Sequence, residues 1–142
     1  PNMSFICSEG LEHSLENMLN VNELNHEISV MLTNDKEIRE LNKKYRNIDK
    51  STNVLSFSIT SDAIVNELKM IGDIVISKDK ILSEARDQHK TFSDHLAHIV
   101  IHGFLHLLDF THDNSEDSII MENKEVELLK MIDIPNPYGD RV

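Results

Sequence analysis

The chain has 142 residues, of which 39% are hydrophobic and 27% are charged. This composition is typical of an ordinary globular domain and excludes an intrinsically disordered chain. A formal net charge of -11 results from 14 Lys and Arg against 25 Asp and Glu, so the summed field repels polyanions unless a local basic patch or a bound cation attracts them. Cys7 is the single cysteine, which excludes an intrachain disulfide and a cysteine-rich metal site.

No apolar run approaches the roughly 18 residues that a membrane-spanning helix needs. Residues 1–11 lack the basic and apolar regions of a signal peptide. We therefore expect a protein of the cytoplasm with no membrane partner. The sequence contains no internal repeat, low-complexity tract or Gly/Ser-rich linker, so we expect residues 1–142 to form a single domain.

The first half of the chain alternates between the period of a strand and that of a helix. In chain order, the pattern predicts a strand over residues 3–7, a helix over 11–19, a strand over 26–32, a helix after Asn34 and a strand over 54–57. Asn34 with Glu37 three residues later resembles a capping box, which marks the start of a helix.

The second half of the chain is mostly helical in its pattern. It predicts a strand over residues 72–76, a short helix capped by Ser77, a helix over 96–108 with cap candidates in 91–94, and a helix from Asn114 or Ser115 to about Ile132. The helix over 96–108 is so apolar that we expect it to be buried on nearly every side. Its polar exceptions are histidines.

Six of the eight histidines lie within a 24-residue stretch that ends at His112. His102 and His106 are four residues apart, so a helix places both rings on one face, about one turn apart. His112 would lie about 120° away on a continuous helix, so the chain must reverse near Asp109 for it to join them. Aspartate tolerates the left-handed conformation of such a turn better than most residues. Three imidazoles with an open fourth position are typical of a catalytic zinc site.

The spacing of these histidines equals that of the long zinc-protease motif HExxHxxGxxH. That motif places its general-base glutamate directly after the first histidine, where this chain has Gly103. A metalloprotease or peptidase is therefore a weak hypothesis. A single histidine is more often a hydrogen-bonded core or surface residue than a ligand, but three at this spacing on an apolar helix favour a shared metal because unpaired buried imidazoles are costly.

The remaining histidines and nearby acids have less defined roles. His98, one turn before His102, is a candidate to support a ligand, to replace one, or simply to lie at the helix margin. We expect His95, like His89, to lie at the surface. A metal-bound histidine usually donates its second N–H to an acceptor, and Asp109 and Asp113 are the candidates for that acceptor.

The stretch from His102 to His112, HGFLHLLDFTH, resembles the signature HGxLHLxGYDH of the YbeY family, bacterial metal-dependent endoribonucleases linked to ribosomal RNA maturation and ribosome quality control. Residues 41–57 are similar to the family block LNxxYRxxDxxT[DN]VLSF, and residues 72–77 resemble its GDIxIS strand. The chain departs from the signature at three adjacent positions, where the family's glycine, tyrosine and aspartate are Asp109, Phe110 and Thr111.

The resemblance implies an α+β fold in which a small four-stranded mixed sheet, three strands parallel and one antiparallel, packs against about five helices. It implies one zinc ion per chain, held by His102, His106 and His112 in a cleft. The ligand set itself also suits nickel or another divalent metal. Arg46 matches an arginine of the family, which is implied to act catalytically in the same cleft. That role fits phosphodiester hydrolysis, because a guanidinium can bind two phosphoryl oxygens while a metal activates the attacking water.

Six of the 14 basic residues fall in the 15-residue window over 36–50. Within it, Lys43 and Lys44 are candidates for contacts to an RNA backbone. The alternative is a solvated helix face, because acidic residues are interleaved and Glu40 can pair with Lys44.

The resemblance implies a metal-dependent, single-strand-specific endoribonuclease that matures the 3' end of 16S ribosomal RNA. Its implied partners are single-stranded or ribosomal RNA, a small-subunit ribosomal protein and a maturation GTPase. The alternative is a non-catalytic ribosome assembly factor, in which the metal is structural and the acidic surface docks a basic protein. Three protein ligands with solvent in the fourth position favour the enzyme, and four protein ligands favour the assembly factor.

Overall fold

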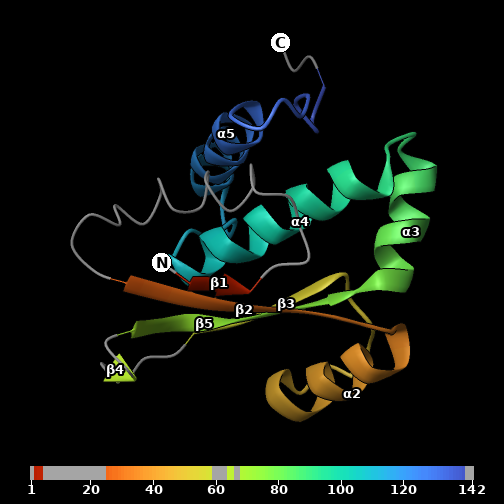
Figure 1. Cartoon of the computed structure of the whole chain (residues 1–142). Helices are drawn as coiled ribbons and strands as arrows, with labels where there is room; N and C mark the ends of the chain where they lie inside the picture. The colour runs from red at the N-terminus through yellow and green to blue at the C-terminus, as the bar shows by residue number, and fades with distance from the viewer. Residues whose placement is uncertain (1, 5–24, 59–63, 66–67, 140–142) are drawn as a thin grey trace.

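The computed structural model describes residues 2–4, 25–58, 64–65 and 68–139, which fold into an α+β arrangement (Figure 1). The strands are β1 (Asn2–Ser4), β2 (Asn25–Thr33), β3 (Val54–Ser58), β4 (Ile64–Val65) and β5 (Leu68–Ser77). The helices are α2 (Asp35–Arg46), α3 (Lys78–Asp87), α4 (Phe92–Leu107) and α5 (Ser115–Lys130).

The sheet has the order β1-β2-β5-β3, and β4 pairs separately with β5. β1, β2 and β5 are parallel, whereas β3 and β4 run antiparallel to β5. The expected α+β class with a mixed sheet is therefore confirmed, and β4 is a short antiparallel strand that the sequence pattern did not predict. Among the described strands, β3 ends the strand order and so forms an edge of the sheet.

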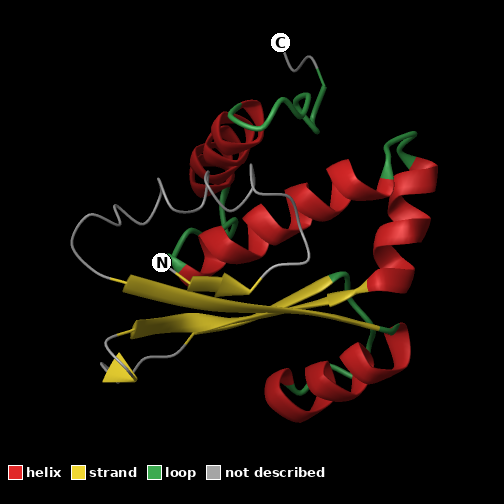
Figure 2. Ribbon diagram, viewed as in Figure 1, coloured by secondary structure: helices red, strands yellow, loops and turns green. Residues whose placement is uncertain are grey.

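Helices cover both faces of the sheet, α2 on one side and α4 on the other, with α5 packed against α4 (Figure 2). On β5, Ile74 and Ile76 belong to the larger core cluster, which α4 dominates. Val75, between them, belongs to a smaller cluster with Ile38 of α2 and Leu55 of β3. Because successive strand residues point to opposite faces, burial on both faces explains the three consecutive apolar residues from Ile74 to Ile76.

The predicted helix caps are present in the structure. Asn34 caps α2 and Ser77 caps α3, and the structure selects Thr91 for α4 and Asn114 for α5. Each side chain accepts a hydrogen bond from a backbone N–H three residues later, which satisfies one of the unpaired donors at a helix start. The strand predicted over residues 72–76 begins earlier, at Leu68, and the last helix ends at Lys130 rather than near Ile132.

The helix predicted over residues 11–19, and residues 5–7 of the first predicted strand, lie outside the described part of the chain. About five helices were expected, and the described residues contain α2 to α5. Among these residues no helix combines the length and apolar character that crossing a membrane requires.

Candidate metal centre and cavity

Three histidines meet at the C-terminal end of α4. His102 and His106 lie on α4, and His112 lies in the loop that leads to α5. One imidazole nitrogen from each residue lies within 4.8 Å of the other two, and the Nε2 atoms of His102 and His106 are 3.0 Å apart. The structure therefore brings together the three residues that the sequence nominated as metal ligands.

The chain reverses after α4 through a residue in the left-handed region. Asp109 has a φ of 69°. Its N–H donates to the carbonyl of His106 at 3.0 Å, and the N–H of Phe110 donates to the carbonyl of Leu105 at 3.0 Å. This pair of hydrogen bonds is the Schellman arrangement that ends many helices. The predicted reversal at Asp109 is confirmed, and it carries His112 back to the other two imidazoles.

Both α4 histidines direct Nδ1 at a hydrogen-bond acceptor. Nδ1 of His102 lies 2.6 Å from Oε1 of Glu125, and Nδ1 of His106 lies 3.0 Å from the carbonyl oxygen of Phe110. A carbonyl cannot donate, and neither can an ionised carboxylate, so Nδ1 is the donor in both contacts. The two Nε2 atoms are then the ring nitrogens directed at each other, 3.0 Å apart.

Two Nε2 atoms that face each other at this distance fit a bound cation. Burial, and then the neighbouring His102, lowers the pKa of His106 below its ordinary value of 6.5. The ring of His106 therefore does not readily take up a second proton on its Nε2 atom. A divalent metal attracts both lone pairs at once, so the residues present suit the metal that the sequence predicted.

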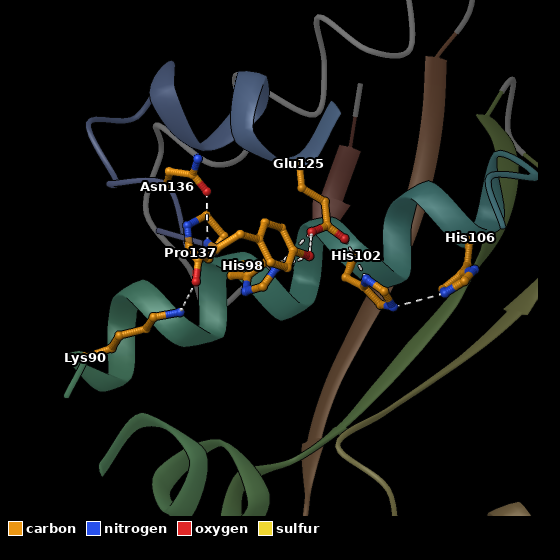
Figure 3. Close-up of polar contacts among 8 residues, drawn as sticks. Lys90, His98, His102, His106, Glu125, Asn136 and Pro137 are labelled. Atoms are coloured by element: carbon orange, nitrogen blue, oxygen red, sulfur yellow. Dashed lines mark hydrogen bonds and ion pairs between the residues drawn. The ribbon is translucent and has the colours of Figure 1, made fainter. Parts of the chain in front are cut away.

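Glu125 of α5 contacts a candidate ligand and was missed by the sequence analysis. Its side chain is fully buried, and it accepts hydrogen bonds from His102, from His98 at 2.9 Å and from the hydroxyl of Tyr138. Burial alone would raise the pKa of Glu125, but the hydrogen bonds from these three side chains outweigh it and lower the pKa to about 2. Glu125 is therefore a buried, ionised carboxylate directly behind His102 (Figure 3).

The proposed acceptors Asp109 and Asp113 were the wrong choice for the two α4 histidines. Both aspartates are exposed, and Glu125 and the Phe110 carbonyl hold the two Nδ1 atoms instead. The sequence did contain a signal for Glu125. It shares a helix face with Met121 and Leu128, which are both buried, so helical periodicity places this acid on the inward side of α5.

The other histidines divide between surface and core. His98 contacts Glu125, the residue that accepts from His102. This agrees with the first of its three predicted alternatives, a residue that supports a ligand. His89 is exposed, as expected. His95 was expected at the surface, but its relative exposure is 2%, and its Nε2 lies 2.9 Å from Oε1 of Glu84. The expectation failed because α3 supplies a carboxylate that pairs with the ring and makes its burial tolerable.

A cavity of about 550 Å³ opens beside the three histidines. Its wall includes the edge strand β3 and the turn after α4, and Arg46 reaches it from the last turn of α2. The Nη2 group of Arg46 donates to the carbonyl of Ser56 at 2.5 Å, and its guanidinium carbon lies 5.5 Å from the centre of the Phe57 ring. The predicted catalytic arginine and the predicted ligands thus line one cavity.

The two lysines predicted to contact RNA lie two and three residues before Arg46 in the sequence. They do not line the cavity. Lys43 and Lys44 are exposed on the last turn of α2. The ammonium of Lys44 lies 5.1 Å from the centre of the Tyr45 ring, and that ring packs edge-on against Phe57.

Gly103 shows why the protease motif is interrupted. It faces the sheet, where an added Cβ would lie 3.0 Å from Cγ2 of Ile74, 3.0 Å from Oγ of Ser56 and 3.2 Å from Cγ2 of Val54. Its carbonyl accepts a hydrogen bond from the Ser56 hydroxyl at 2.9 Å. A glutamate therefore does not fit at this position, and the close contact of α4 with β3 and β5 depends on the glycine.

The comparisons with known proteins agree with this geometry. A family model described as Endoribonuclease YbeY matches residues 3–133. The chain belongs to the YbeY family. Among curated YbeY proteins, it is 43% identical to the endoribonuclease YbeY of Ruthia magnifica subsp. Calyptogena magnifica over 132 residues, which cover 89% of this chain and 90% of that protein. It is 40% identical to that of Bartonella bacilliformis, with 86% of this chain and 78% of the relative covered.

A solved structure supports the assignment. The YbeY-family chain is similar to the solution structure of TM1509 from Thermotoga maritima, with a TM-score of 0.60 and 28% sequence identity. The similarity covers 87% of this chain and 79% of that one. Against the YbeY signature quoted above, Asp109 takes the left-handed position at which the signature has glycine, and Thr111 donates to Asp117 of α5 at 3.2 Å. These departures leave the three histidines clustered.

Proposed function

We propose that this chain is a metal-dependent, single-strand-specific endoribonuclease of the cytoplasm that acts in 16S ribosomal RNA 3' end maturation and ribosome quality control. The observation that carries the proposal is the cavity in which Arg46 and three clustered histidines face the same space, in a chain of the YbeY family. The family membership supports RNA as the substrate, and the cavity supports hydrolysis of a phosphodiester.

His102, His106 and His112 would hold the metal, most simply a zinc ion, because three nitrogen ligands with an accessible remaining position are typical of catalytic zinc. When bound, such an ion supplies Lewis-acid chemistry and lowers the pKa of water. The chain contributes the orientation of the ligands. Glu125 and the Phe110 carbonyl hold two Nδ1–H groups, and the exposed His112 lies at the open side of the site.

Arg46 would bind the phosphoryl group undergoing cleavage. One of its nitrogens donates to the Ser56 carbonyl, which fixes the guanidinium at the cavity and leaves further N–H donors for two phosphoryl oxygens. Those donors stabilise the charge that develops in the transition state. The cation and Arg46 together also create a local positive field, which an RNA needs on a chain of net charge -11.

Lys43 and Lys44 would contact the RNA backbone on the side of the cavity beyond Arg46. Their exposure and their position one turn or less before Arg46 support this role. We further propose that a small-subunit ribosomal protein and a maturation GTPase are partners, as the family resemblance implies.

The test uses the purified chain with measured metal content. We expect about one divalent metal per chain, cleavage of single-stranded RNA in preference to a duplex of the same sequence, and loss of cleavage on chelation with recovery on adding zinc. Nickel or another metal restoring more activity than zinc would correct the metal alone. A metal-loaded protein that cleaves no RNA would contradict the enzyme and favour the assembly factor with a structural metal.

A further inference from the structure

Glu125 accepts hydrogen bonds from three side chains, two on α4 and one in the segment after α5. On α4, Nδ1 of His102 lies 2.6 Å from Oε1 and Nε2 of His98 lies 2.9 Å from Oε2. From the segment after α5, the hydroxyl of Tyr138 donates to Oε2. Figure 3 shows the carboxylate of Glu125 pointing at His102 from the side opposite His106. Both oxygens of this buried carboxylate are therefore engaged.

The contact with His102 sets the direction in which that ring faces. Oε1 of Glu125 accepts from Nδ1 of His102, so Nδ1 carries the donated proton and Nε2 is the ring nitrogen turned toward His106. A carboxylate also makes a neutral imidazole a better electron donor than a backbone carbonyl does. His106 has only the Phe110 carbonyl in the equivalent position, so the two ligands are oriented by acceptors of different strength.

The segment after α5 is folded so that Tyr138 reaches this carboxylate. Asp133 turns the chain with a φ of 59°, and the carbonyl of Pro137 accepts a hydrogen bond from Nζ of Lys90 at 3.2 Å. The N–H of Tyr138 donates to Oδ1 of Asn136 at 2.9 Å. The Tyr138 ring also packs edge-on against the His98 ring, with centroids 5.5 Å apart.

We propose that Glu125 and Tyr138 are positioning residues of the metal site: Glu125 acts through His102, and the Tyr138 hydroxyl acts through Glu125. The segment over residues 131–139 is then part of the support of the metal centre, although it contributes no ligand. The inference rests on the proposed metal-binding role of the three histidines.

The test measures metal affinity and imidazole tautomer in addition to activity. Three single variants are compared with the parent: Glu125→Gln, Tyr138→Phe and, as a matched control, Glu84→Gln. Glu84 accepts from His95 at 2.9 Å, which is the same kind of carboxylate–histidine contact about two helical turns from His102. Zinc affinity is measured by competition with a chromophoric chelator. The tautomer of His102 is read in the metal-free protein from long-range proton–nitrogen NMR correlations.

We expect Glu125→Gln to weaken zinc binding by about 10- to 100-fold, the usual cost of removing an acceptor behind a ligand, and to mix the two tautomers of His102. Tyr138→Phe should weaken zinc binding by a smaller factor, while Glu84→Gln should leave zinc affinity and the His102 tautomer as in the parent. If Glu125→Gln does not fold, Tyr138→Phe decides the question, because it removes a single oxygen.

Some outcomes would reject the positioning roles of Glu125 and Tyr138 and leave the proposed function intact. Zinc affinity and tautomer unchanged in both Glu125→Gln and Tyr138→Phe would reject both positioning roles while the parent still binds metal. A weakened Glu125→Gln with an unchanged Tyr138→Phe would reject the role of Tyr138. An equal loss in Glu84→Gln would show a general effect of removing an acid that pairs with a histidine. A parent that binds no divalent metal would overturn the proposed function, and the positioning roles with it.

Discussion

Nδ1 of His106 lies 3.0 Å from the carbonyl oxygen of Phe110, a residue beyond the end of α4. The same residue uses its N–H to close the last turn of the helix on Leu105. One backbone unit therefore both ends α4 and fixes the direction of a candidate ligand. The turn that makes this possible is set by Asp109, so the conformation of Asp109 is coupled to the metal site.

Asp109→Gly should stabilise the protein by up to about 1 kcal/mol, because glycine adopts a positive φ without the steric cost that aspartate bears. Asp109→Val should destabilise it and weaken metal binding, because a β-branched residue strains at this φ. Urea unfolding and zinc titration check both expectations. Asp113→Gly, in the same loop, is the control and should not gain stability. A more stable Asp109→Val variant would contradict the strain at this turn, and one that binds zinc as tightly as the parent would contradict the link between the turn and the site.

His112→Ala should reduce metal affinity by more than about 100-fold, beyond the usual effect of losing a residue that only supports a ligand. The variant should still fold, because His112 is exposed and lies outside the helices. Competition with a zinc chelator measures the affinity, and circular dichroism monitors the fold. His89→Ala is the matched control, since His89 is also an exposed loop histidine. Unchanged affinity in His112→Ala would remove it from the ligand set.

Arg46→Ala should lower kcat on single-stranded RNA by about 100- to 1,000-fold, the usual cost of removing a donor to a developing charge. Arg46→Lys should recover little of this loss, because an ammonium cannot bind two oxygens side by side. Zinc content should stay at the parent level in both. Arg39→Ala provides the control from the same helix, because Arg39 pairs with Asp49 at the surface. Parent-like cleavage by Arg46→Ala would end the catalytic role of this arginine.

Gly103→Ala should cost about 1 to 3 kcal/mol of stability, because its methyl group would press on Ile74 and Ser56 in a well-packed interface. Gly103→Glu should fail to fold rather than gain peptidase activity. Thermal unfolding of the metal-free protein tests the alanine variant. Ser93→Ala, at an exposed position of α4, should change stability little. A Gly103→Ala variant as stable as the parent would show that α4 can move away from the sheet.

Acid should destabilise the fold through His95. Burial lowers the pKa of His95 below its ordinary value of 6.5, and this effect exceeds the opposing influence of Glu84. The unfolded chain therefore takes up a proton on His95 at a higher pH than the folded chain does. The resulting stability is present above about pH 6.5 and is lost as the pH falls towards the lowered pKa.

The comparison of parent with His95→Gln isolates this effect. In the metal-free proteins, the unfolding free energy of the parent should fall more steeply between pH 7 and lower pH than that of the variant, measured by urea denaturation. His89→Gln should keep the slope of the parent. A His95→Gln variant with the same pH slope as the parent would show that His95 does not contribute.

The sequence predicted those features of the site that depend on residues close together in the chain. The spacing from His102 to His112 requires a reversal. Asp109 was predicted as its residue because the zinc-protease motif has a glycine at that position, and aspartate tolerates the left-handed conformation. The helix caps Asn34 and Ser77 were predictable for the same reason, because each side chain accepts from a backbone N–H only three residues later. Arg46 was nominated by the family resemblance, since nothing in local sequence shows that the end of α2 reaches a cavity beside α4.

The rest depended on contacts between distant segments. Glu125 is 23 residues from His102, and helical periodicity marks it as inward-facing without naming the group it meets. His95 was misplaced for the same reason, because its burial depends on Glu84 of α3. The short strand β4 escaped notice because its pairing with β5, not its own pattern, defines it.

Arg46 has one more consequence through the carbonyl that it binds. Ser56 belongs to β3, the outermost strand on its side of the sheet, and an outermost strand offers its backbone to the strands of other molecules. The guanidinium occupies one carbonyl of this outermost strand, so the contact that fixes Arg46 beside the cavity also satisfies a backbone acceptor that would otherwise depend on water.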